Sequence, residues 1–98
     1  MVRHVVMFRW QADTPDDAKQ AVRDGLAALP GAIPEIRRYE FGPDLALADG
    51  NFDFAVVADF DDAEAYGRYA RHDAHRVLIA ERIRPHLAER AAVQYEVD

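Results

Sequence analysis

The chain has 98 residues, no cysteine and a formal net charge of −6, so we expect one domain over residues 1–98 without disulfides or cysteine-ligated zinc. The acidic balance argues against a nucleic-acid partner, which would need a cationic surface. No apolar run approaches the ~20 residues of a membrane span and no signal peptide is recognised, so we expect a cytoplasmic protein without a membrane partner.

Residues 3–10 are predicted to form a strand, because β-branched and aromatic side chains dominate and glycine and proline are absent. A helix is predicted over residues 15–29, where apolar residues recur at helical spacing. Thr14 is a suitable N-cap and Pro15 suits the first turn. The helix is expected to end at the segment PGAIP, since proline cannot continue the hydrogen-bond pattern.

The later elements are predicted from apolar patterning and turn residues. They are strands over 35–41 and 52–60, helices over 61–69 and 73–87, and a last strand over 90–97. Asp61 and Asp73 are the expected caps of the two helices. Pro85 is expected to kink or end the second of them.

The resulting order, β-α-β-β-α-α-β, predicts an α+β fold of the ferredoxin-like type with a four-stranded antiparallel sheet. The first and third strands are apolar on both faces, which is typical of the central strands of a sheet covered on both sides. Helices can cover one face only, and monomers rarely leave a large apolar patch in water. A second copy is the simplest cover, so we predict a homodimer.

The chain resembles the stress-responsive dimeric α+β barrel (Dabb) family. The resemblance follows the segments RHVVMFRW, LPGAIPEIRRYEFGPDL, FDFAVVADFDDAEAYGRYARHDAH and VQYEV in this order, and so covers nearly the whole chain. It implies a ferredoxin-like protomer whose sheet forms a barrel with that of a second copy. Plant stress proteins and polyketide cyclases of the olivetolic acid cyclase type belong to this family.

In those cyclases a strand histidine, a helix tyrosine and a second histidine serve an aldol cyclisation without a cofactor. The resemblance places His4, Tyr69 and His75 at the matching positions, and His72 matches a further recurring histidine. Asp73 departs from the proline that many relatives carry there, but it can still begin a helix.

The strand pattern places His4 on the same face as Val6 and Phe8. A break near Asp73 would turn His75 inward, so that His4, Tyr69 and His75 converge between sheet and helices. A buried histidine beside a phenol suits general acid–base catalysis, and Tyr69 could stabilise an oxyanion. The expected pocket residues around this catalytic set are Val6, Phe8, Tyr66, His72 and Leu78.

Three functions remain open at this point. The first is a binding protein with a pocket for a small apolar or polyketide-like ligand. The second is a cofactor-independent polyketide cyclase or aldol-type lyase in which His75 is the base, supported by His4 and Tyr69. The third is a structural dimer module without a ligand. Zinc on His72, Asp73 and His75 is disfavoured because one short helical segment offers too few convergent ligands, so neither a metal nor a cofactor is expected.

Overall fold

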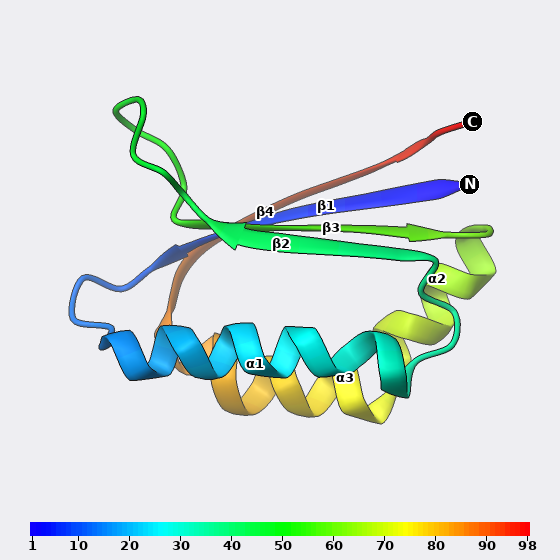
Figure 1. The fold of residues 1–98 in the computed structure, drawn as a ribbon, viewed down its shortest axis with the longest axis horizontal. Helices are drawn as coiled ribbons and strands as arrows, with labels where there is room; N and C mark the ends of the chain where they lie inside the picture. The colour runs from blue at the N-terminus through cyan, green and yellow to red at the C-terminus, as the bar shows by residue number, and fades with distance from the viewer.

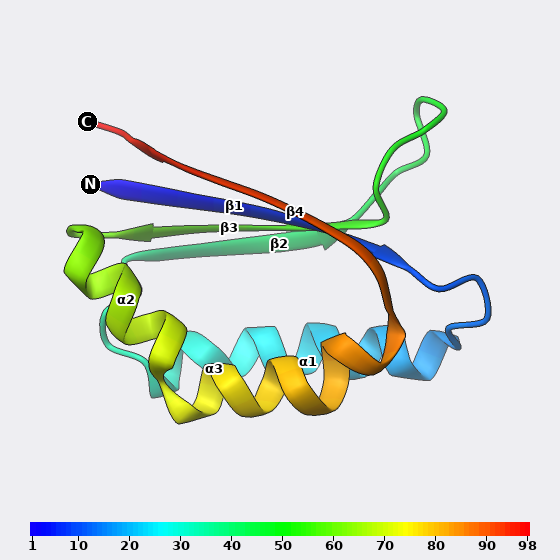
Figure 2. The same ribbon diagram turned by 180° about the vertical axis from the view of Figure 1, so that it is seen from behind.

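The computed structural model describes residues 1–98 as one antiparallel sheet covered on one face by helices (Figures 1 and 2). The strands are β1 (Val2–Trp10), β2 (Arg38–Pro43), β3 (Phe54–Phe60) and β4 (Leu87–Glu96). Helices α1 (Asp16–Ala32) and α3 (Asp73–Leu78) lie side by side across the sheet, and α2 (Ala63–Arg71) lies at one end. The strand order β2-β3-β1-β4 confirms the ferredoxin-like arrangement with β1 and β3 in the centre.

The core lies between the sheet and the helices. Alternate residues of β1 and β3 point into it, among them Val6, Phe8, Phe54, Val56 and Phe60, all of which are buried. Val22, Leu26 and Leu29 of α1 are buried against them. Strand alternation and the helical period therefore meet in one apolar layer, as the sequence pattern indicates.

The opposite face of the sheet, here called the outer face, is apolar in its middle. Met7 is 38% exposed, Val93 is 56% exposed and Tyr95 is 47% exposed. In the sheet register Val5 of β1 lies between Val93 of β4 and Val57 of β3 on this face. The loop between β2 and β3 projects on this side, away from the helices (Figure 1). No helix of the chain covers the outer face.

Helix α1 continues through Pro30 to Ala32, so the predicted end at residue 29 is wrong. Proline removes one backbone donor, but the Ile33 N–H still donates to the Leu29 carbonyl oxygen at 2.9 Å, and both side chains are buried. Packing therefore outweighs the lost bond. The predicted cap is also wrong: Thr14 Oγ1 donates to the Gln11 carbonyl oxygen at 2.8 Å, and Pro15 stands at the N-cap.

Other boundaries shift by one to three residues. Strand β2 begins at Arg38 because a turn occupies Pro34 and Glu35, β3 begins at Phe54, and β4 begins at Leu87. Asp62 rather than Asp61 caps α2, accepting from the Ala65 N–H at 2.8 Å. The last helix changes type along its length, from α3 to a π-helical segment (Ile79–Ile83) and a 3-10 turn (Arg84–His86) that contains Pro85.

The contact between α1 and α3 depends on Gly25. A Cβ atom at this position would overlap Leu78 Cδ1, and Leu78 is buried. A Cβ at Gly31 of the same helix would meet nothing within 4 Å. Gly31→Ala should therefore be more stable than Gly25→Ala by about 1–3 kcal/mol, since both gain helix propensity but only Gly25→Ala overpacks the core. Urea unfolding of the two variants measures this difference, and equal stabilities would contradict the close packing of α1 on α3.

Candidate functional site

The break between α2 and α3 sets the position of the site. His72 has extended backbone angles (φ −64°, ψ 137°) and is the N-cap of α3. Its Nδ1 accepts a hydrogen bond from the Ala74 N–H at 3.1 Å, so His72 rather than Asp73 caps the helix. Because the chain turns here, the His75 ring packs on the Tyr69 ring with a centroid distance of 4.3 Å. The two residues would not meet in this way on one continuous helix.

A cavity of about 150 Å³ lies where these side chains meet the sheet. Its apolar lining comes from β1, α1, β3 and the π-helical segment: Val6, Phe8, Leu26, Val56, Ile79 and Ile83. The volume is well below the ~300 Å³ at which pockets for drug-sized ligands begin.

His4 borders the cavity from β1 and is only 4% exposed. Its Nδ1 lies 2.8 Å from Nε2 of Gln94 on the neighbouring strand β4. An amide nitrogen can only donate, so Nδ1 accepts and the ring proton sits on Nε2. Burial, with a smaller effect of Arg90 and His75, lowers the pKa of His4 to about 4. At neutral pH His4 is therefore an uncharged hydrogen-bond donor through Nε2.

His75 has the opposite tautomer. Its Nδ1 lies 3.2 Å from the Ala70 carbonyl oxygen. A carbonyl oxygen can only accept, so Nδ1 carries the proton and Nε2 keeps its lone pair. Burial lowers the pKa of His75, and the charge of Arg90 acts in the same direction, against the opposing effect of the Ala70 hydrogen bond. At neutral pH His75 is thus an uncharged proton acceptor.

Two tyrosines complete the polar lining on the β2 side. The hydroxyl oxygens of Tyr39 and Tyr69 lie 2.8 Å apart, so one donates to the other and a second O–H remains for another partner. Burial raises the pKa of Tyr39 to about 12 and also raises that of Tyr69, which keeps both phenols protonated at neutral pH. Tyr66 also borders the cavity, its ring 5.0 Å from that of His4.

The structure brings together His4, Tyr69 and His75 around one cavity, with Val6, Phe8 and Tyr66 beside them. His72 and Leu78 do not line it. His72 is used as a helix cap, and Leu78 packs against α1 at Gly25.

Sequence reasoning missed Tyr39, Gln94 and Arg90. Each is brought to the site by strand pairing, which sets Gln94 opposite His4 and Arg90 opposite Phe8. The alternation of β4 was the one available signal, because it puts Arg90 and Gln94 on the same face of the sheet.

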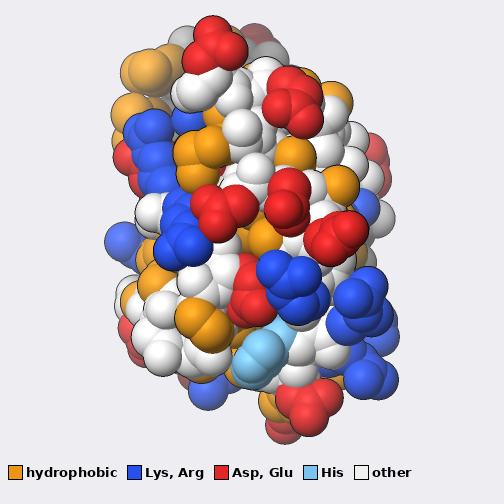
Figure 3. Space-filling model, turned by 90° about the vertical axis from the view of Figure 1, so that its right-hand side faces the viewer, with side chains coloured by type: hydrophobic (Ala, Val, Ile, Leu, Met, Phe, Trp, Pro, Cys, Tyr) orange, Lys and Arg blue, Asp and Glu red, His pale blue; other side chains and the backbone are white.

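No group of three or more histidine, aspartate or glutamate side chains converges in a way that could hold a metal ion. No helix is long and apolar enough to pass through a lipid bilayer. At the end of the molecule that carries α2, acidic and basic side chains are interspersed (Figure 3). Pairs such as Arg37 with Asp61, at 2.9 Å, and Arg68 with Glu35, at 3.0 Å, form there. That end is an ordinary solvated surface.

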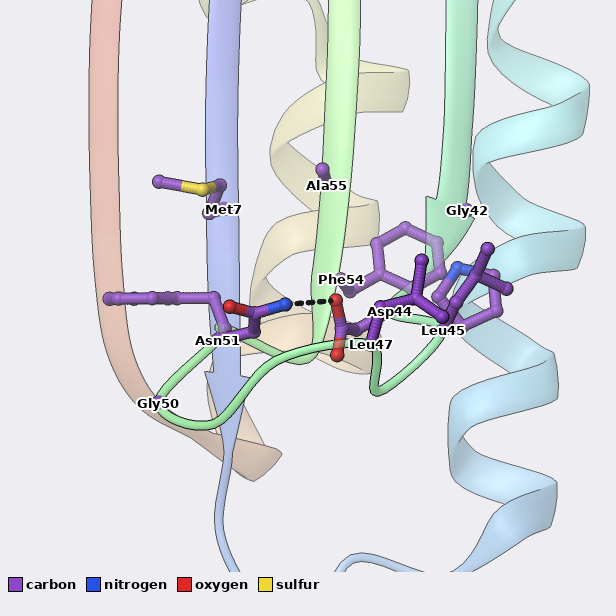
Figure 4. Close-up of a pocket in the computed structure, with 11 residues that line it drawn as sticks. Met7, Gly42, Asp44, Leu45, Leu47, Gly50, Asn51, Phe54 and Ala55 are labelled. Carbon is purple, nitrogen blue, oxygen red and sulfur yellow. Dashed lines mark hydrogen bonds between the residues drawn. The ribbon is translucent and has the colours of Figure 1, made fainter.

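A larger and more open hollow of about 560 Å³ lies under the β2–β3 loop (Figure 4). Met7, Leu45, Leu47, Phe52 and Ala55 contribute to its lining. The Asn51 amide donates to Asp44 within the loop at 3.1 Å. No histidine or tyrosine borders this hollow, and it opens at the apolar outer face, so it lacks the titratable groups that line the sheet–helix cavity.

Known proteins share both the sequence pattern and the fold. The model of the stress responsive A/B barrel domain family matches residues 2–97. An uncharacterized protein of Streptomyces coelicolor is 30% identical over 82 residues, which is 82% of this chain and 84% of that protein. A dimeric ferredoxin-like protein of unknown function from Thermobifida fusca is 46% identical, with a TM-score of 0.91 over 98% of this chain and 90% of that one.

A likeness in fold extends further. Hydroxynitrile lyase from Passiflora edulis superposes with a TM-score of 0.85 at 20% identity, over 99% of this chain and 93% of that enzyme. At this identity the comparison shows a shared fold alone. The family match spans nearly the whole length, and the predicted resemblance is confirmed: this chain belongs to the stress responsive A/B barrel domain family.

Proposed function

We propose that this protein binds a small, largely apolar carbonyl compound in the sheet–helix cavity and acts on it as a cofactor-independent, aldol-type lyase. The observation that carries the proposal is the pair of neutral histidines with opposite tautomers at one cavity, His4 as donor and His75 as acceptor. A general base must be unprotonated at the working pH, as His75 is, and a neutral N–H such as that of His4 can stabilise negative charge on oxygen. This chemistry requires no further group from outside the chain.

In the proposed cleavage, Nε2 of His75 takes the hydroxyl proton of a β-hydroxy carbonyl compound or cyanohydrin. The oxygen forms a carbonyl as the carbon–carbon bond breaks, and the electron pair leaves with the departing fragment. The imidazolium of His75 then returns the proton to that fragment. The Nε2–H of His4 and the free O–H of the tyrosine pair are suited to stabilise oxygen charge during these steps.

The cavity volume favours this reading over a polyketide cyclase. About 150 Å³ leaves room for a short chain but not for an extended polyketide. The remaining space also argues against a purely structural module, because neither Tyr66 nor Leu78 fills it. Binding without turnover remains the second candidate, supported by the apolar lining. The hydroxynitrile lyase of the same fold makes a cyanohydrin a reasonable first probe.

We also infer that two copies of the chain pack through their outer faces. The exposed side chains of Met7, Val93 and Tyr95 form an apolar surface that a monomer would leave in water. The hollow under the β2–β3 loop continues this surface. The Thermobifida fusca relative, at 46% identity, is described as dimeric.

Acetone cyanohydrin and 4-hydroxy-4-methylpentan-2-one are short enough to test the lyase. The protein should release cyanide or acetone above the buffer rate, and His75→Gln should lower kcat/KM about 100-fold or more, as expected for the loss of a general base. His72→Asn is the matched control, since asparagine keeps a helix cap and the side chain lies outside the cavity. Because the pKa of His75 is lowered from 6.5, the acid decline of kcat/KM should lie below pH 6.5.

Thermal shift with the same compounds separates the two candidate functions. Stabilisation without turnover by any of them would contradict the lyase and favour a binding protein. Turnover that survives in His75→Gln would contradict the assignment of the base.

The pH dependence of stability tests the state of His4. Its pKa of about 4 lies below the 6.5 of the unfolded chain, so between these values the unfolded chain binds more protons than the fold. The free energy of unfolding should therefore fall by about 1–2 kcal/mol as pH drops through this window, after allowance for solvent screening. Urea unfolding at several pH values should show this loss, reduced in His4→Gln. An NMR titration that puts His4 near 6.5 would contradict its burial as a neutral ring.

A charge on the outer face should separate the two copies. Val93→Asp would place a carboxylate in the apolar interface and should shift the mass in solution from twice 11.1 kDa to 11.1 kDa at micromolar concentration. Val77→Asp on α3 is the control, because Val77 is similarly exposed (53% against 56%) but lies away from that face. Light scattering that finds the unmodified chain monomeric would refute the dimer.

A further inference from the structure

Arg90 borders the cavity from the edge strand β4. It is paired with Phe8 of β1 in the sheet register, and Phe8 points toward the helices. Arg90 therefore points to the same side as His4 and Gln94 and lines the cavity together with His4, Tyr69 and His75. The residue as a whole is exposed, so its guanidinium is reached by solvent while it borders an apolar space.

The charge of Arg90 is uncompensated. It is the only formally charged residue that lines the cavity, and no aspartate or glutamate lies among the others. None of the ion pairs and none of the side-chain hydrogen bonds of the structure includes it. Both histidines facing it are neutral, and its charge helps to lower the pKa of each. The guanidinium of Arg90 therefore borders the cavity with no carboxylate of the protein paired to it.

The neighbouring groove on the outside of α3 provides a contrast. It shares His75 and Ile79 with the cavity, but its two arginines, Arg76 and Arg84, are accompanied by Asp73 and Glu81. The groove thus has as many carboxylates as arginines, and Arg76 lies 3.8 Å from Asp73. Of these two hollows, only the cavity is lined by a cation and no carboxylate, in a chain whose net charge is −6.

We infer that the ligand of the cavity carries a carboxylate and that Arg90 binds it. The planar guanidinium offers two parallel N–H donors that match the two oxygens of a carboxylate. The apolar side chains of Val6, Phe8 and Ile83 accept a short hydrocarbon portion. The inference rests on the proposed function of this cavity and narrows its substrate class to short β-hydroxy ketones or aldehydes that also carry a carboxylate.

Anchoring the carboxylate at the edge of the sheet also orients the ligand. A molecule of this size that is held at one end by Arg90 keeps its other end within the space bordered by His4 and His75. Arg90 is thus a binding and specificity-determining residue, and the proton transfer remains with His75.

Butyrate and butyramide provide a matched pair of probes, because they are nearly isosteric and differ in charge. NMR titration of the histidine ring signals at pH 7 measures both dissociation constants with the unmodified chain. Butyrate should bind about tenfold or more tightly than butyramide, as expected for a charge-assisted pair. Arg90→Leu should remove this preference and Arg90→Lys should keep part of it. Arg23→Leu on α1, a residue that does not line the cavity, should leave it unchanged.

The outcomes separate this inference from the proposed function. Equal binding of butyrate and butyramide by the unmodified chain overturns the role of Arg90 and leaves the cavity as a site for neutral ligands. A preference for butyrate that persists in a folded Arg90→Leu variant also overturns it. Failure of both probes to perturb His4 or His75 overturns the binding function of the cavity and the role of Arg90 with it.

Discussion

The structure depends on a sheet whose central strands are apolar on both faces. Strands β1 and β3 place Phe8, Phe54 and Phe60 against the helices and Val5, Met7 and Val57 on the other side. Two helices suffice for one face of a sheet of this width, so the second face remains for another layer. The histidine–tyrosine cavity lies on the helix side and the exposed apolar surface on the other. One sequence pattern thus separates the cavity from the apolar surface that the helices leave uncovered.

The interruption at His72 converts the helical layer into a site. If α2 and α3 were one helix, residues 69, 72 and 75 would spread over its surface. The extended conformation of His72 instead redirects α3, and its own ring stabilises the new N-terminus. The π-helical segment then presents Ile79 and Ile83 to the cavity, and such irregular turns are often found at functional sites. The break at His72 and the π-helical segment therefore set the positions of cavity-lining residues that one regular helix could not bring together.

The sequence predicts the elements, their order and the central position of β1 and β3, because these follow from periods of 2 and 3.6 residues. It also predicts that His4 points toward the helices. It does not predict that α1 passes Pro30, since the burial of Leu29 and Ile33 against distant strands decides this point. The predicted N-caps of α2 and α3 are each one residue from the observed ones. Several neighbouring polar side chains can cap a helix, and only the backbone angles choose between them.

The sequence does not predict which residues of other strands and helices join the candidate site. Gln94 sets the tautomer of His4, Tyr39 holds the hydroxyl of Tyr69, and Arg90 supplies the only charge. Gln94 and Arg90 depend on the register of β4 on β1, in which Gln94 lies 90 residues from His4 along the chain. Tyr39 meets Tyr69 from strand to helix, 30 residues apart. Such register is fixed by the whole sheet rather than by local sequence. The family resemblance indicates the three central residues but not these neighbours, which determine how the three behave.

Electrostatics and volume together limit the chemistry of the cavity. Two neutral imidazoles and two protonated phenols supply donors and one strong acceptor without fixed charge, so the field in the cavity comes mainly from Arg90. That field would stabilise negative charge in the cavity, whether on a carboxylate or on an enolate or alkoxide. It opposes protonation of His75, which keeps the base free at neutral pH but weakens it. Binding of an anion at Arg90 would offset that field and raise the basicity of His75 only when substrate is present, which couples recognition of the ligand to activation of the base.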